Sequence, residues 1–99
     1  MDRAQVIARL KAVEPQLRAH GVAALYLFGS YARDEARPDS DIDVFVDKIP
    51  GRSFGLDEFT GAYEVLQDAI PGATVGYTTR DGIVDCYRPY IEHGAIRVF

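Results

Sequence analysis

Apolar residues recur every three or four positions over residues 6–17, which predicts an amphipathic helix in the first part of the chain. Asp2, followed three residues later by Gln5, has the pattern of a reciprocal N-cap at the start of that helix. Pro15 predicts a kink or a division of the helix, because proline cannot donate the hydrogen bond that a helix interior requires. His20, which precedes a glycine, marks the expected end.

A continuous apolar run, Val22–Phe28, predicts a buried strand, because it is long enough for a strand and short for a helix. The run stops at Gly29, and we expect a short helix from about Ser30. Over Ile42–Val46 every second residue is apolar and faces the predicted core, which indicates a second strand. Polar residues would then occupy its other face.

The rest of the chain predicts two more helices and two more strands. An amphipathic pattern from about Asp57 to Ile70 predicts a helix, and Ala73–Thr78 is a third strand candidate. Arg88–His93 has the pattern of a short helix with a proline in its first turn, and Ile96–Phe99 predicts a final short strand or an apolar tail docked on the sheet. These elements predict an α/β (α+β) fold, with a small mixed sheet and helices packed mainly on one side.

Composition limits the functions that fit this chain. Its 99 residues predict one domain, and the net charge of −4 argues against nucleic-acid binding through a basic surface. No apolar run approaches the roughly 20 residues of a membrane span, and the N-terminus lacks the pattern of a signal peptide. A single cysteine, Cys86, excludes an intrachain disulfide, so we expect a cytoplasmic protein.

Two neighbouring patterns indicate phosphate chemistry. A strand that ends in Gly29 and Ser30 and turns into a helix presents backbone N–H groups and a hydroxyl to a phosphate. Ten residues later come Asp41 and Asp43, whose side chains share a strand face because they lie two positions apart. Paired carboxylates beside a phosphate suit Mg²⁺. In a plainer interpretation, the aspartates form the solvated face of an edge strand and the Gly-Ser pair is an ordinary turn.

The order Gly29–Ser30, ten residues, then Asp41–Asp43 closely resembles the signature of the polymerase-beta-like nucleotidyltransferase superfamily. Ala32–Arg33 and Ser40, next to Asp41, narrow the resemblance to the minimal nucleotidyltransferases of the HEPN/MNT antitoxin type. The resemblance covers most of the chain and implies a single nucleotidyltransferase domain over residues 1–99. It also implies Mg²⁺ as cofactor, ATP as the substrate, and a HEPN-type toxin as partner.

The resemblance implies a role for each residue of the signature. Asp41 and Asp43 would be the catalytic residues and would hold the metal, whereas Gly29, Ser30 and Arg33 would bind the nucleotide. Arg33 has an alternative role in a surface ion pair with an acidic neighbour. Such a protein would transfer AMP to a hydroxyl of its partner, with a homo-oligomer as another way to supply that hydroxyl.

The third strand departs from the family pattern. Relatives carry a third carboxylate there, and the matching position in this chain is Gly76. Asp68, Asp81 and Asp85 are alternative sources of that carboxylate. The departure leaves three functions open: an adenylylating enzyme, a catalytically degraded module that masks a toxin without chemistry, and a nucleotide-sensing regulatory domain.

Two other features complete the set of expectations. Asp34 stands where relatives usually have glycine, which indicates an unusual backbone angle at that residue. The tyrosines are numerous for a chain of this size, and they either pack in the fold, line a partner surface or stack on a base. The pattern does not choose among these roles. The five tyrosines in question are Tyr26, Tyr63, Tyr77, Tyr87 and Tyr90.

Overall fold

A computed structural model describes all residues from Met1 to Phe99. Five α-helices, one short 3₁₀ helix and four strands follow one another along the chain. The elements are α1 (Arg3–Ala12), α2 (Glu14–Ala19), β1 (Val22–Phe28), α3 (Gly29–Ala32), β2 (Ile42–Lys48), α4 (Leu56–Ala69), β3 (Val75–Thr79), η1 (Arg80–Gly82), α5 (Arg88–Gly94) and β4 (Ile96–Arg97).

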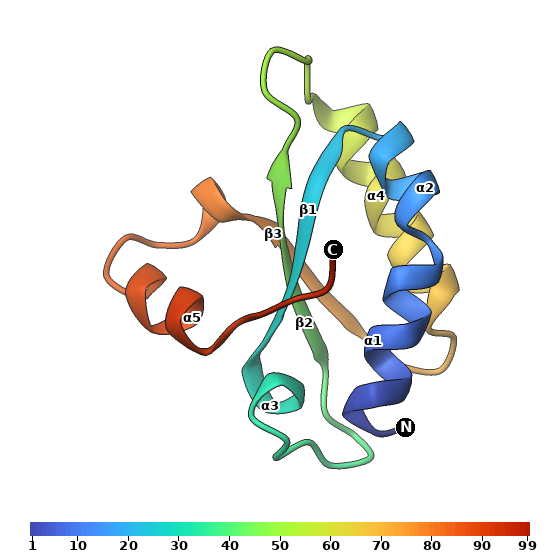
Figure 1. Ribbon diagram of the computed structural model, residues 1–99, viewed down its shortest axis with the longest axis vertical. Coiled ribbons are helices and arrows are strands. Elements are labelled where there is room, and N and C mark those ends of the chain that lie inside the picture. Colours follow the sequence, from blue (N-terminus) through green and yellow to red (C-terminus); the bar gives the residue numbers. More distant parts are fainter.

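The four strands form one mixed sheet in the order β3-β2-β1-β4 (Figure 1). β1 runs antiparallel to β2 and to β4, whereas β2 and β3 are parallel. The register places Asp43 between Phe28 on one side and Gly76 on the other. β2 is therefore an interior strand, so the interpretation of its aspartates as part of an edge strand is wrong.

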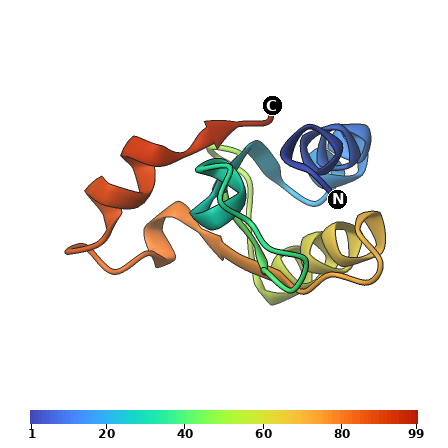
Figure 2. The same ribbon diagram turned by 90° about the horizontal axis from the view of Figure 1, so that it is seen from below.

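Helices α1, α2 and α4 pack on one face of the sheet, and α5 lies on the other side (Figures 1 and 2). The core between the three helices and the sheet is built from aliphatic side chains that are fully buried. This arrangement confirms the predicted fold class. The largest of those side chains are Leu10, Leu17, Leu25, Leu27, Ile42, Leu66 and Ile70.

Local sequence signals explain where the first helices begin and end. The amide of Gln5 donates to Asp2 Oδ1 at 2.8 Å and the amide of Asp2 donates to Gln5 Oε1 at 2.9 Å, which confirms the reciprocal cap. Pro15 occupies the first turn of α2, where its missing N–H has no cost, and Val13 separates α2 from α1. The predicted division of the helix at this proline is confirmed.

The face of β2 that points away from the core helices is less polar than the alternation predicts. Phe45 lies on that face and is fully buried. Its ring stacks on Tyr26 at a centroid distance of 4.7 Å, and the guanidinium of Arg80 lies 4.9 Å from its centre. The pattern misses this second cover because its parts come from distant segments of the chain.

The structure has no helix of the length and apolar character that a membrane crossing requires.

Candidate active site

The carboxylate of Asp43 is seated between two glycines. A Cβ atom placed on Gly76 would lie 2.6 Å from Asp43 Oδ1, and one placed on Gly29 would contact Oδ2 even more closely. Gly29 comes directly after β1, whereas Gly76 is the neighbour of Asp43 on β3. Any side chain at either glycine would therefore displace the carboxylate.

The second aspartate and an arginine act on Asp43 through their charges. Burial is the largest cause that raises the pKa of Asp43, and the negative charge of Asp41 raises that pKa further. The positive charge of Arg33 lowers it. Asp41 itself is exposed and lies one residue before β2 begins. Two carboxylates in mutual repulsion, one of them partly desolvated, form a site that a cation stabilises.

The turn from β1 into α3 forms the neighbouring part of the site. Gly29 has φ +74°, a left-handed conformation that side chains other than glycine rarely adopt, and Ser30 follows it half-buried in the first turn. The first amides of a helix have no partner within the helix, so they can donate to a phosphate. α3 has only four residues, so the expected contribution of a helix dipole is small and the amides and the Ser30 hydroxyl are the available donors.

The two residues after α3 test two of the sequence expectations. Arg33 Nε donates to Glu35 Oε2 at 3.3 Å, and both side chains are more than half exposed. Such a surface pair contributes little to stability, so the guanidinium can exchange Glu35 for another anion. Asp34 has φ +58°, which confirms the unusual backbone angle that the sequence indicates at this residue.

The structure places Gly76 where a third carboxylate would have to stand. Gly76 and Asp43 are register partners on the same face of two parallel strands. Asp68 lies on α4, which covers the opposite face, Asp81 is bonded to Lys48 at the far end of β2, and Asp85 is paired with Arg88 in solvent. No group of three or more acidic, histidine or cysteine side chains comes together anywhere in the chain.

These positions decide how the site fits a metal. The two aspartates beside a phosphate-binding turn fit one Mg²⁺ shared with a nucleotide, because Mg²⁺ takes one or two carboxylates together with substrate phosphates. A second ion would lack the ligand that Gly76 fails to provide. The geometry therefore fits binding of one metal–nucleotide complex, and it provides no third carboxylate for the activation of an attacking hydroxyl.

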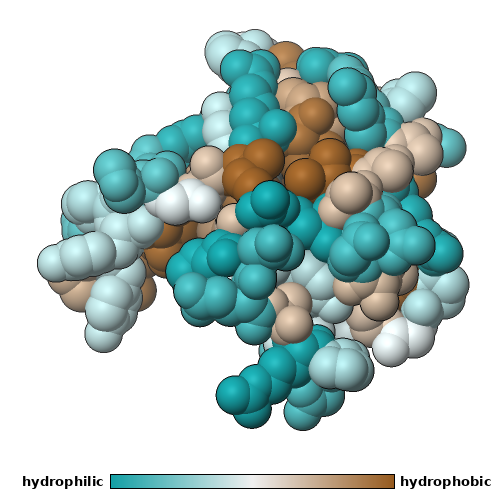
Figure 3. Space-filling model, turned by 60° about the horizontal axis from the view of Figure 1, so that its bottom comes forward, coloured by the Kyte–Doolittle hydropathy of each residue, from teal (hydrophilic) through white to brown (hydrophobic).

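A cavity of about 320 Å³ opens beside Gly29, between α3 and α5. In the space-filling view, hydrophobic atoms are visible between the arm at the left, to which α5 belongs, and the body of the molecule (Figure 3). Gly29 belongs both to the wall of this cavity and to the seat of Asp43. The residues that line it are Phe28, Gly29, Arg33, Tyr90, Ile91 and Gly94.

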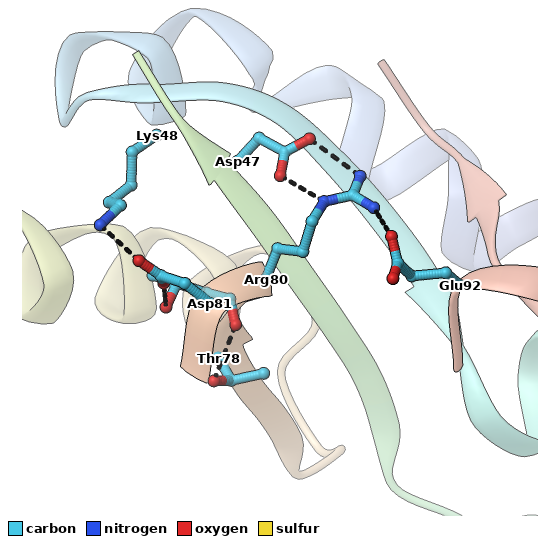
Figure 4. A network of polar contacts seen from close by, with 7 residues as sticks. Asp47, Lys48, Thr78, Arg80, Asp81 and Glu92 are labelled. Atoms are coloured by element: carbon cyan, nitrogen blue, oxygen red, sulfur yellow. Dashed lines mark hydrogen bonds and ion pairs between the residues drawn. The ribbon is translucent and has the colours of Figure 1, made fainter. Parts of the chain in front are cut away.

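A charged network holds the opposite end of this sheet face (Figure 4). Arg80 forms a fork with the carboxylate of Asp47, at 2.7 and 3.0 Å, and also pairs with Glu92 of α5. These contacts raise the pKa of Arg80, which stays charged throughout. Arg80 and Asp47 are 33 residues apart and no periodic pattern links them, so the sequence carries no signal for this network.

Comparisons with known proteins agree with this geometry. The sequence model of the family described as "Nucleotidyltransferase domain" matches residues 10–91. The "Putative protein adenylyltransferase MJ0435" of Methanocaldococcus jannaschii is 36% identical over 84 residues, which cover 85% of this chain and 87% of that protein.

Two solved structures have a similar fold. One, described as "Structure of putative minimal nucleotidyltransferase", is 32% identical, with a TM-score of 0.79 over 97% of this chain and 95% of that chain. The other, "Crystal structure of the toxin-antitoxin with AMP-PNP", is 17% identical, with a TM-score of 0.65 over 100% of this chain and 73% of that one. The family model, the Methanocaldococcus jannaschii protein and the structure with 32% identity together show that this chain belongs to the nucleotidyltransferase domain family.

Proposed function

We propose that this chain binds a nucleoside triphosphate, with ATP as the candidate, together with Mg²⁺, and transfers its nucleotidyl group to a hydroxyl of a partner protein. The observation that carries the proposal is the seat of Asp43 between Gly29 and Gly76, with Asp41 close enough to raise its pKa. Membership of the nucleotidyltransferase family supports the reaction type.

Each residue of the site has a task in this proposal. The amides of Gly29 and Ser30 and the Ser30 hydroxyl bind the terminal phosphates, and Arg33 leaves Glu35 to offset phosphate charge. Asp41 and Asp43 hold Mg²⁺, which when bound neutralises charge on the phosphates. In the transfer, the acceptor oxygen bonds to the α-phosphorus and its proton passes to solvent water. The bond from that phosphorus to the oxygen that bridges the α- and β-phosphates breaks, and pyrophosphate leaves with that oxygen.

The proposed acceptor is a toxin of the HEPN type, with this chain as its antitoxin. The support is the fold shared with a toxin–antitoxin structure that carries AMP-PNP, a nonhydrolysable analogue of ATP. The relative from Methanocaldococcus jannaschii is named "Putative protein adenylyltransferase MJ0435", and this name supports AMP as the group transferred.

One observation favours a second candidate function. Gly76 leaves the site without a third carboxylate, and no group of three side chains that could hold a metal forms in the chain. A chain with this site can bind the metal–nucleotide complex in the ground state and still lack a group that acts in the transition state. It would then mask its partner by binding alone.

A labelling experiment separates the two candidates. The chain is co-expressed with the product of the adjacent gene, and the purified pair is incubated with ATP labelled on the α-phosphate. The proposal predicts labelled partner with the parent chain and none with Asp43→Asn. Absence of label with the parent, together with Mg-ATP binding that Asp43→Asn weakens, would replace transfer with the masking function.

A further inference from the structure

The cavity between α3 and α5 differs in character from the other cavity of the molecule. Its walls include the rings of Phe28 and Tyr90 and the aliphatic side chain of Ile91, with Arg33 as its only charged residue. The other cavity, of about 340 Å³, lies near the far end of β2 and is lined mainly by charged side chains, such as Lys48, that are paired with one another. Only the α3–α5 cavity offers aromatic and aliphatic surface for a flat, largely apolar ligand.

Tyr90 is the wall residue whose role the fold does not explain. The residue is 81% exposed, and it belongs to a helix that has no buried residue. A tyrosine that packs in the fold would bury its ring, so packing does not account for this residue. An exposed ring that lines a cavity can bind the face of a base, because every base has a π-face available for stacking.

The cavity also adjoins the position that the proposed function gives to the phosphates of the nucleotide. Gly29 is both a wall of the cavity and the residue against which Asp43 is seated. A nucleotide whose phosphates lie at Gly29 and Ser30 therefore has its nucleoside within reach of this cavity. The volume of about 320 Å³ is at the lower end of the range typical for small-molecule sites.

We propose that the α3–α5 cavity binds the nucleoside part of the substrate nucleotide, with its base stacked on Tyr90. This inference rests on the proposed function, because it places the remainder of the same nucleotide. It assigns part of the wall of the base site to α5, an element that the Gly29–Asp43 signature does not include.

Calorimetric titration tests the assignment with two ligands, Mg-ATP and Mg-tripolyphosphate, which has the phosphates without the nucleoside. Stacking of a base on an aromatic ring accounts for about a 5- to 150-fold change in affinity when the ring is removed. Tyr90→Ala is expected to weaken Mg-ATP by a factor in that range and to leave Mg-tripolyphosphate unchanged. Tyr90→Phe, which keeps the ring, is expected to bind both ligands like the parent.

Tyr87→Ala is the matched control. Tyr87 is also exposed, at 62%, and lies one residue before α5, but it does not line the cavity. Its removal is expected to change neither affinity. Equal losses of Mg-ATP affinity in Tyr87→Ala and Tyr90→Ala would contradict the assignment.

Other outcomes separate a failure of this inference from a failure of the proposed function. If Mg-ATP binds the parent and Asp43→Asn weakens it, but Tyr90→Ala does not, the base lies elsewhere and the nucleotide site stands. If Tyr90→Ala keeps nucleotide affinity and loses the partner protein, the cavity belongs to the partner and the inference is wrong. If neither ligand binds the parent, the proposed function fails and this inference fails with it.

Discussion

The substitution Gly29→Ala tests the seat of Asp43. It combines an unfavourable backbone angle with a contact on the Asp43 carboxylate, and each effect occurs alone at another glycine of the chain. Gly29 has φ +74° and its added methyl group would meet the Asp43 carboxylate. Gly51 has φ +77° with nothing within 4 Å, so Gly51→Ala has the backbone effect alone. Gly76→Ala has the contact alone, because its backbone does not have a positive φ.

The magnitudes follow from this division. A left-handed conformation costs a side-chain-bearing residue about 1–2 kcal/mol, so Gly51→Ala should lower the free energy of unfolding by that amount. In a domain of this size, that corresponds to a melting temperature lower by about 4–16 °C. Gly76→Ala should cost less than Gly51→Ala, because the atom that its methyl group meets is the movable end of the Asp43 side chain. Gly29→Ala should cost approximately the sum of the two.

Urea unfolding measures the stabilities, and calorimetric titration with Mg-ATP measures the function of the seat. We expect Gly29→Ala and Gly76→Ala to weaken Mg-ATP, since both displace the Asp43 carboxylate, and Gly51→Ala to leave it unchanged. If Gly29→Ala and Gly51→Ala lose equal stability and Gly76→Ala keeps full Mg-ATP affinity, the carboxylate is not seated between the glycines.

Three further predictions follow from other contacts. Because burial and Asp41 raise the pKa of Asp43, the stability that this group contributes is present at low pH and is lost as the pH rises through the raised pKa. Asp43→Asn should therefore raise the melting temperature of the metal-free chain at neutral pH, and an unchanged or lower melting temperature would contradict the raised pKa. Protonation of Asp43 also competes with Mg²⁺, so Mg-ATP affinity should rise with pH over the acidic range and then level off, and a flat profile in the parent would exclude Asp43 as a ligand. Arg80→Ala removes the fork on Asp47 and the cover over Phe45, and should cost about 2 kcal/mol in urea unfolding, with Arg80→Lys recovering only part of it; full stability of Arg80→Ala would contradict the role of the network.

Most of the fold could be predicted because its signals are local. The Asp2–Gln5 cap, the break at Pro15 and the apolar run of β1 each depend on residues close in sequence, and the structure has them all. Differences at element ends are small: α4 begins at Leu56, since Gly55 donates its amide to Glu58 and serves as the cap. Strand pairing decides the other ends, so β3 is displaced to Val75–Thr79.

The residues of the site also differ in whether the sequence alone could predict them. The signature residues can be found in sequence because they lie in one continuous stretch around a strand, a turn and a second strand. The proximity of Gly76 to Asp43 was expected only from the family pattern, and the parallel pairing of β2 and β3 brings it about. The place of Tyr90 in the cavity wall and the link from Arg80 to Glu92 could not be predicted, because both depend on how α5 folds back against the sheet.

Asp41 and Asp43 are proposed to hold Mg²⁺ for a nucleotide bound at Gly29 and Ser30. Calorimetric titration of a nonhydrolysable ATP analogue tests it directly, in the parent, Asp41→Asn and Asp43→Asn, with Mg²⁺ and again with a chelator. Residues that merely support metal ligands already change affinity about 10- to 100-fold, so each substitution should weaken Mg²⁺-dependent binding at least tenfold. Binding that is equally tight in all three chains, or that persists in the chelator, would contradict the claim.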